Sequence, residues 1–145
     1  MTFKTSLQEA AAYFVHDVLS ENIEEVASTT RKRAYAASIE ANGDGQRQKW
    51  IVSAFIAKPS LKKMALTFLN DPEADNETLS DLIKEIANII VGRTKVIAAE
   101  KGLGFDISTP SFVGVAKPIP SDSDFQLHFK FGSDIWTIAV KKAAQ

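Results

Sequence analysis

The chain has 145 residues, 45% of them hydrophobic, which suits a single domain, residues 1–145, with a full core. Its formal net charge of −1 gives no general attraction to nucleic acid or to anionic membranes, so neither is expected as a partner. The absence of cysteine excludes disulfide scaffolds, thiol catalysis and cysteine-ligated metal sites. There is no apolar signal core and no apolar run of membrane-spanning length, so a soluble cytoplasmic protein is expected.

Apolar periodicity predicts three helices, and alternation of apolar and polar residues predicts the strands. Ser6-x-x-Glu9 has the pattern of a capping box, from which a first helix runs to about Glu21. A short second helix opens at Pro59, and Thr78-x-x-Asp81 is a candidate cap for a long third helix. The expected strands are 33–41, 49–57, 105–108, 112–117, 125–131 and 135–140.

Consecutive strands joined by tight turns favour a mostly antiparallel sheet. The predicted fold is therefore α+β, with about six strands packed against three helices. Ser121-Asp-Ser-Asp124 lacks the glycine and the terminal glutamate of an EF-hand. We expect this segment to be a hairpin connection between two strands.

The most informative segment is Asp81-Leu-Ile-Lys-Glu85-Ile-Ala-Asn88-Ile-Ile-Val-Gly92, in the long helix. A helix turns by about 100° per residue, so one face of this segment is apolar and must be buried. That face comprises Leu79, Leu82, Ile83, Ile86, Ile90 and Ile97. Glu85 and Asn88 lie on the other side, one turn apart. Asparagine is unfavourable within a helix and glycine costs about 1 kcal/mol relative to alanine, so the exposed face is shaped by more than stability.

The motif Glu85-Ile-Ala-Asn88-Ile-Ile-Val-Gly92 and the order of elements resemble the CheX branch of the CheC/CheX/FliY chemotaxis phosphatases. That family carries Glu-x-x-Asn on a helix, followed by a strand and a Ser-x-Pro segment, here Ile107-Ser-Thr-Pro110. Lys84 stands where the family commonly has glycine. Glu73-Ala-Asp-Asn76 also fits the bare motif, but it falls in a predicted loop with no defined face. One usable copy is typical of CheX rather than CheC.

The resemblance implies a phosphatase that hydrolyses the aspartyl phosphate of a CheY-like response regulator in chemotaxis signalling. In that family the motif asparagine orients a water in line with the phosphorus, a role that maps onto Asn88. The motif glutamate, which matches Glu85, pairs with a lysine of the regulator. The regulator brings the phospho-aspartate and its Mg²⁺, so the resemblance implies no cofactor and no metal of this chain's own.

The resemblance also favours a homodimer in which two sheets join edge to edge. Lysine and aspartate residues near the strand ends would instead protect an edge in a monomer.

Several alternatives stay open from the sequence alone. Glu85 and Asn88 are otherwise ordinary solvated helix residues, and Gly92 either admits a partner helix or accommodates the protein's own sheet. A second functional hypothesis is a non-catalytic response-regulator or flagellar-switch-like binding module, and a third is a regulator-specific binder outside motility. His16 and His128 are too far apart in sequence to indicate a metal site.

Overall fold

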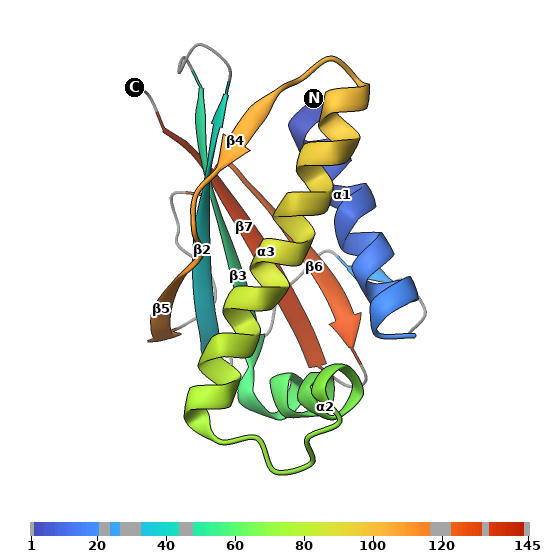
Figure 1. Cartoon of the computed structure of the whole chain (residues 1–145), viewed down its shortest axis with the longest axis vertical. Coiled ribbons are helices and arrows are strands. Elements are labelled where there is room, and N and C mark those ends of the chain that lie inside the picture. Colours follow the sequence, from blue (N-terminus) through green and yellow to red (C-terminus); the bar gives the residue numbers. More distant parts are fainter. Residues whose placement is uncertain are drawn as a thin grey trace.

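The computed structural model describes residues 2–20, 24–26, 33–43, 48–116, 123–131 and 134–143. Within these residues, helices cover one face of a seven-stranded antiparallel sheet, so the predicted α+β fold is confirmed (Figure 1). The helices are α1 (Thr2–Tyr13), its π-helical continuation η1 (Phe14–Val18), α2 (Lys58–Leu69) and α3 (Asn76–Glu100). The strands are β1 (Glu25–Val26), β2 (Ala34–Gly43), β3 (Lys49–Ala57), β4 (Phe105–Ile107), β5 (Ser111–Ala116), β6 (Phe125–Phe131) and β7 (Asp134–Ala143).

The sheet is centred on β3, which pairs with β2 on one side and with β7 on the other. Its strand order is β1-β6-β7-β3-β2-β4, and β5 also pairs with β2. One edge is therefore the two-residue β1, and the other consists of β4 and β5 along successive parts of β2. The short β1 is the strand that the sequence did not predict, since two residues are too few to show a period.

The predicted hairpin at Ser121-Asp-Ser-Asp124 is wrong, because β5 and β6 lie in different parts of the sheet and do not pair. Residues 121 and 122 lie outside the described residues. Adjacency in sequence favours pairing but does not require it, and here both strands pair with partners far away in the chain.

The N-terminal helix begins earlier than the sequence predicted. α1 starts at Thr2, and Ser6 is buried within it instead of capping it. The ring of Phe3 stacks on Trp50 of β3 with centroids 4.4 Å apart, and this contact requires helix upstream of Ser6. Burying a phenylalanine contributes about 1.5–3 kcal/mol against about 1 kcal/mol for a cap, so packing sets the start of the helix. Glu21, the predicted end, lies outside the described residues.

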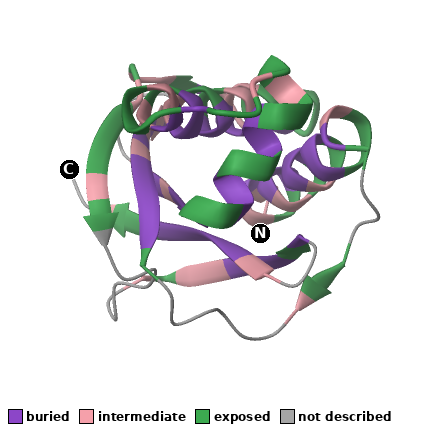
Figure 2. Cartoon of the chain, turned by 90° about the horizontal axis from the view of Figure 1, so that it is seen from below, coloured by how far each residue is buried: buried purple, intermediate pink, exposed green. Residues whose placement is uncertain are grey.

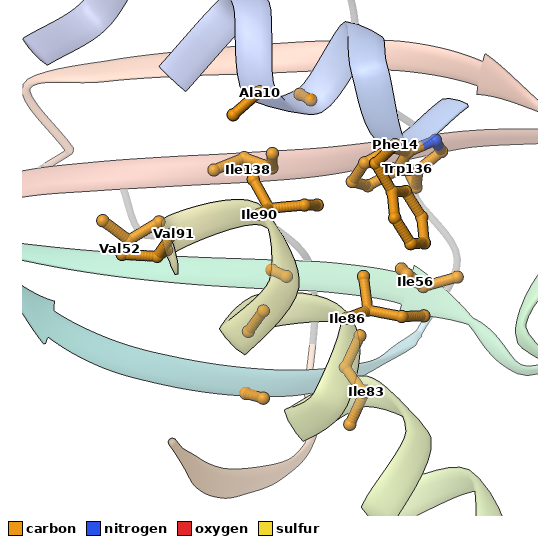
Figure 3. Close-up of a cluster of buried hydrophobic side chains, with 14 of the residues drawn as sticks. Ala10, Phe14, Val52, Ile56, Ile83, Ile86, Ile90, Val91, Trp136 and Ile138 are labelled. Carbon is orange, nitrogen blue, oxygen red and sulfur yellow. The ribbon is translucent and has the colours of Figure 1, made fainter. Parts of the chain in front are cut away.

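The long helix α3 lies across the sheet, with α1 beside it and α2 near its N-terminal end (Figure 1). Buried residues gather where the helical layer meets the sheet, and exposed residues mark the outer sides of the helices (Figure 2). Figure 3 shows Ile86 and Ile90 of α3 in one cluster with Ile56 of β3 and Ile138 of β7. The predicted apolar face is buried as expected, except that Ile97 is only partly buried. No helix in the described ranges is long and apolar enough to span a membrane.

The start of α3 differs from the predicted cap at Thr78-x-x-Asp81. The N-cap is Asp75, whose carboxylate accepts a hydrogen bond from the Thr78 N–H at 2.8 Å. This backbone hydrogen bond, with a second from the Thr78 side chain, holds the pKa of Asp75 below its ordinary value. Because the folded-state pKa is depressed, the cap stabilises the helix at neutral pH, and its contribution is lost as the pH falls through that pKa.

Candidate functional site

The exposed side of α3 carries both predicted site residues. The buried face of the helix fixes its rotation, and Glu85 and Asn88 are both exposed on the opposite side. Their spacing of three residues corresponds to about 4.5 Å along the helix axis. Within the part of the chain that the structure describes, neither side chain has a hydrogen-bond or ion-pair partner. Both groups are therefore available to a ligand or to another protein.

Three further residues complete what we call the α3 stripe, which consists of Asp81, Lys84, Glu85, Asn88 and Gly92. The Lys84 ammonium forms an ion pair with Asp81 Oδ1 at 3.3 Å, one turn towards the N-terminus. A Cβ added at Gly92 would meet no atom within 4 Å. The protein's own packing therefore does not require this glycine, which leaves bare backbone one turn beyond Asn88.

Contacts on both sides hold the helix in place. The Arg93 guanidinium lies 4.1 Å from the centre of the Tyr13 ring, which joins α3 to α1. On the side of the sheet, the Tyr35 hydroxyl of β2 donates a hydrogen bond to Asn76 Oδ1 at 2.8 Å. The centre of the Phe112 ring of β5 lies 5.9 Å from the centre of the Tyr35 ring, so β5 packs beside the tyrosine that holds Asn76. These contacts between distant residues leave no local sequence signal, and they keep the stripe on a firmly supported helix.

The second Glu-x-x-Asn copy does not form a comparable pair. Asn76 is the first residue of α3, and its amide oxygen accepts the hydrogen bond from Tyr35. Glu73 is exposed in the preceding turn, outside the helix. The two side chains therefore share no helical face, as the sequence indicated, although Asn76 itself belongs to the helix and not to the loop.

The Ser-x-Pro segment has a structural place at the sheet edge. Ser108 Oγ accepts a hydrogen bond from the Glu40 N–H at 2.9 Å, and the Ser108 N–H donates to the Glu40 carbonyl at 2.9 Å. These two bonds attach the link between β4 and β5 to β2. Pro110, which lacks an N–H, ends this attachment before β5 begins.

The two histidines lie in different surroundings. His16 is exposed and its Nδ1 lies 3.0 Å from the carboxylate of the adjacent Asp17. His128 is buried in β6 and shares a hydrogen bond of 2.9 Å with Thr137 of β7. Burial lowers the pKa of His128, against a smaller raising effect of Glu25. Over the described ranges, no group of three or more histidine, cysteine or carboxylate side chains is placed to hold a metal ion.

Residues 35–124 match the family model described as chemotaxis phosphatase CheX. This match covers more than half of the chain and includes the whole α3 stripe. The chain belongs to the CheX family. The family that the sequence resembles is thus confirmed.

Solved structures share the fold over nearly the whole chain. CheX from Vibrio vulnificus has 19% identity and a TM-score of 0.82, covering 97% of this chain and 96% of that one. CheX from Desulfovibrio desulfuricans has 14% identity and a TM-score of 0.78, covering 99% and 100%. CheX in the CheX–CheY–BeF₃–Mg²⁺ complex from Borrelia burgdorferi has 18% identity and a TM-score of 0.73, covering 97% of each chain. No curated protein matches the sequence.

The open surroundings of Gly92 generate a prediction about stability. Gly92→Ala should stabilise the isolated CheX-family protein by about 0.5–1 kcal/mol, because alanine is the better helix former and its methyl group meets open space. Gly102→Ala is the matched control, since a Cβ there also meets no atom within 4 Å but the backbone has φ +88°. That variant should lose stability. Urea unfolding measures both, and destabilisation by Gly92→Ala would show that the protein's own fold requires the glycine.

Proposed function

We propose that this CheX-family protein is a phosphatase that hydrolyses the aspartyl phosphate of a CheY-like response regulator in chemotaxis signalling. The observation that carries the proposal is the exposed, unpartnered pair of Glu85 and Asn88 beside the open backbone at Gly92. The complex of the Borrelia burgdorferi CheX with CheY supports this class of partner. The protein would act in the cytoplasm, where it meets the phosphorylated regulator.

Asn88 is the proposed catalytic residue. Phosphoryl transfer depends mainly on positioning and on charge stabilisation, with little covalent work for the protein. A carboxamide accepts a hydrogen bond from a water and donates another at the same time, without placing a charge beside the phosphate. Asn88 would enter the regulator's site and hold the water in line with the phosphorus. The missing side chain at Gly92 lets the regulator approach closely enough for this.

Glu85 is the proposed docking residue, through an ion pair with a lysine of the regulator. The spacing of about 4.5 Å along the axis lets one helix present both groups to a single small site. The proposal assigns Mg²⁺ to the regulator and no cofactor to this chain. The chain would therefore complete an active site that its partner largely supplies.

Asn88→Ala should abolish stimulated dephosphorylation and leave binding of the regulator largely intact, because the lost interaction is made only in the transition state. Phosphate release from a phosphorylated CheY-like receiver measures the effect. Asn76→Ala is the matched control from the second copy of the motif. It should keep turnover but lose about 1 kcal/mol of stability with the Tyr35 hydrogen bond. Near-normal turnover by Asn88→Ala would contradict the catalytic assignment, and a wild-type protein that binds the receiver without hydrolysis would be a binding module.

Glu85→Gln should weaken the binding free energy for the regulator by about 2 kcal/mol or more. This is the usual cost of removing one partner from a desolvated ion pair at an interface. Titration with a beryllofluoride-activated receiver measures the affinity. Glu73→Gln, in the exposed turn before α3, removes the same charge from the other copy of the motif and should change little. An unchanged affinity for Glu85→Gln would remove this residue from the interface.

We also propose a homodimer joined through β5. This strand lies at the sheet edge and carries no charged residue from Ser111 to Ala116, so no lysine or aspartate within the strand itself protects the edge. Three of its apolar side chains are exposed, Phe112 by 39%, Val113 by 59% and Val115 by 45%. Pairing with the same strand of a second copy would cover both these side chains and the open backbone groups.

Light scattering at micromolar concentration should therefore give a dimer mass for the wild type and a lower mass for Val113→Lys, whose charge opposes strand pairing at this edge. Leu66→Lys, at a 50% exposed position on α2, is the control and should leave the mass unchanged. A monomeric wild type would reject the dimer. The catalytic proposal would stand, since a single α3 carries the whole stripe.

A further inference from the structure

We propose that Lys84 determines specificity for the phosphorylated form of the regulator, by leaving Asp81 and binding the anionic phosphoryl group presented to Asn88. The inference rests on the proposed function and assigns to it a residue where the family commonly has glycine.

Lys84 is placed to reach the same ligand as Asn88. It precedes Asn88 by four residues, so the two lie on the same side of α3, about 6 Å apart along the axis. Its side chain is 36% exposed, and its ammonium is turned towards Asp81, away from Asn88. The lysine side chain is a flexible chain of four carbons, so rotation about its bonds is enough to move the ammonium from Asp81 towards Asn88.

The present partner holds the lysine only weakly. The Asp81 side chain is 69% exposed, and a solvated ion pair between exposed groups adds little stability. A phosphoryl group carries more negative charge than a carboxylate and offers several acceptor oxygens. In a docked complex that excludes water, Lys84 gains more from the phosphoryl group than it loses by leaving Asp81.

Lys84 is the only basic residue among the five residues of the α3 stripe. Asp81 and Glu85 are acidic, and Glu85 is assigned to the regulator's lysine, so Lys84 is the residue of the stripe that can attract an anion approaching Asn88. Lys95 lies on the same side of the helix, but it pairs with Asp106 at 3.4 Å and stands about 10 Å along the axis from Asn88. Within the stripe, Lys84 carries the one positive charge, and it favours a receiver that carries the phosphoryl anion.

The test is the affinity of the full chain for a CheY-like receiver, titrated with and without beryllofluoride and Mg²⁺. Lys84→Gln should weaken binding of the activated receiver by about fivefold and hardly change binding of the unactivated one. In turnover assays the same variant should raise KM and leave kcat almost unchanged, as expected for a contact made equally in the ground and transition states. Lys95→Gln removes an equivalent surface cation from the same helix side and should leave both affinities unchanged.

A double-mutant cycle identifies the role of Asp81. Asp81→Asn should strengthen binding of the activated receiver because it frees Lys84, and this gain should vanish in the Asp81→Asn/Lys84→Gln variant. If the gain in affinity persists in the double variant, Asp81 simply repels the activated receiver. That result would overturn the proposal that Lys84 leaves Asp81 to bind the phosphoryl group. Equal weakening of both receiver forms by Lys84→Gln would place the lysine against the regulator's own carboxylates and overturn the phosphoryl assignment.

The two levels of the proposal fail differently. If the wild type does not accelerate phosphate release, the proposed function falls and this inference falls with it. If the wild type is active but Asn88→Ala retains full turnover, the catalytic assignment of Asn88 falls, and the placing of the phosphoryl group beside Lys84 falls with it. If the wild type is active and Asn88→Ala is not, while Lys84→Gln behaves like Lys95→Gln, only the role of Lys84 is overturned.

Discussion

Burial of one face of α3 against the sheet is the constraint on which the exposed surface of this protein depends. Rotation of the helix about its axis would expose side chains such as Ile86 and Ile90, each at a cost of about 1.5–3 kcal/mol. Among the described residues, the contacts on the outer side do not return a comparable amount, because the ion pairs of Lys84 with Asp81 and of Lys95 with Asp106 lie between solvated groups. Burial of the isoleucines thus keeps Glu85 and Asn88 on the outer side of the helix.

Because the buried face of α3 supplies the stability, the outer face can carry residues that lower the stability of a helix. Asn88 and Gly92 both lower helix stability, but the buried face, the Asp75 cap and the contact of Arg93 with Tyr13 supply it elsewhere. The stripe that results combines an amide, two carboxylates, a lysine and open backbone. Under the proposed function, this set of groups would recognise and complete a partner's phosphoryl site. The dimer proposed through β5 uses a different element, so the proposed assembly and the proposed chemistry do not compete for the same residues.

Local patterns in the sequence predicted those features of the fold that depend on a single helix or strand. The helical period in 79–97 predicted which side of α3 is buried, and therefore that Glu85 and Asn88 are exposed. The alternation in β6 likewise predicted its apolar face, where Leu127 and Phe129 are buried, but it wrongly predicted a solvated opposite face, since His128 is buried there. The roles proposed for the exposed pair came from the family resemblance, since exposure alone assigns no chemistry.

Pairings between distant residues were decided only by the tertiary structure. The sequence placed a cap at Ser6, but the stacking of Phe3 on Trp50 moved the start of α1 upstream. The sequence allowed two explanations of Gly92, the approach of a partner helix or packing against the protein's own sheet. The open space around this residue excludes the second explanation. A periodic segment by itself determines which of its faces is buried, because burial of apolar area favours one face. Which partner meets that face depends on packing across the whole chain, and no local pattern encodes it.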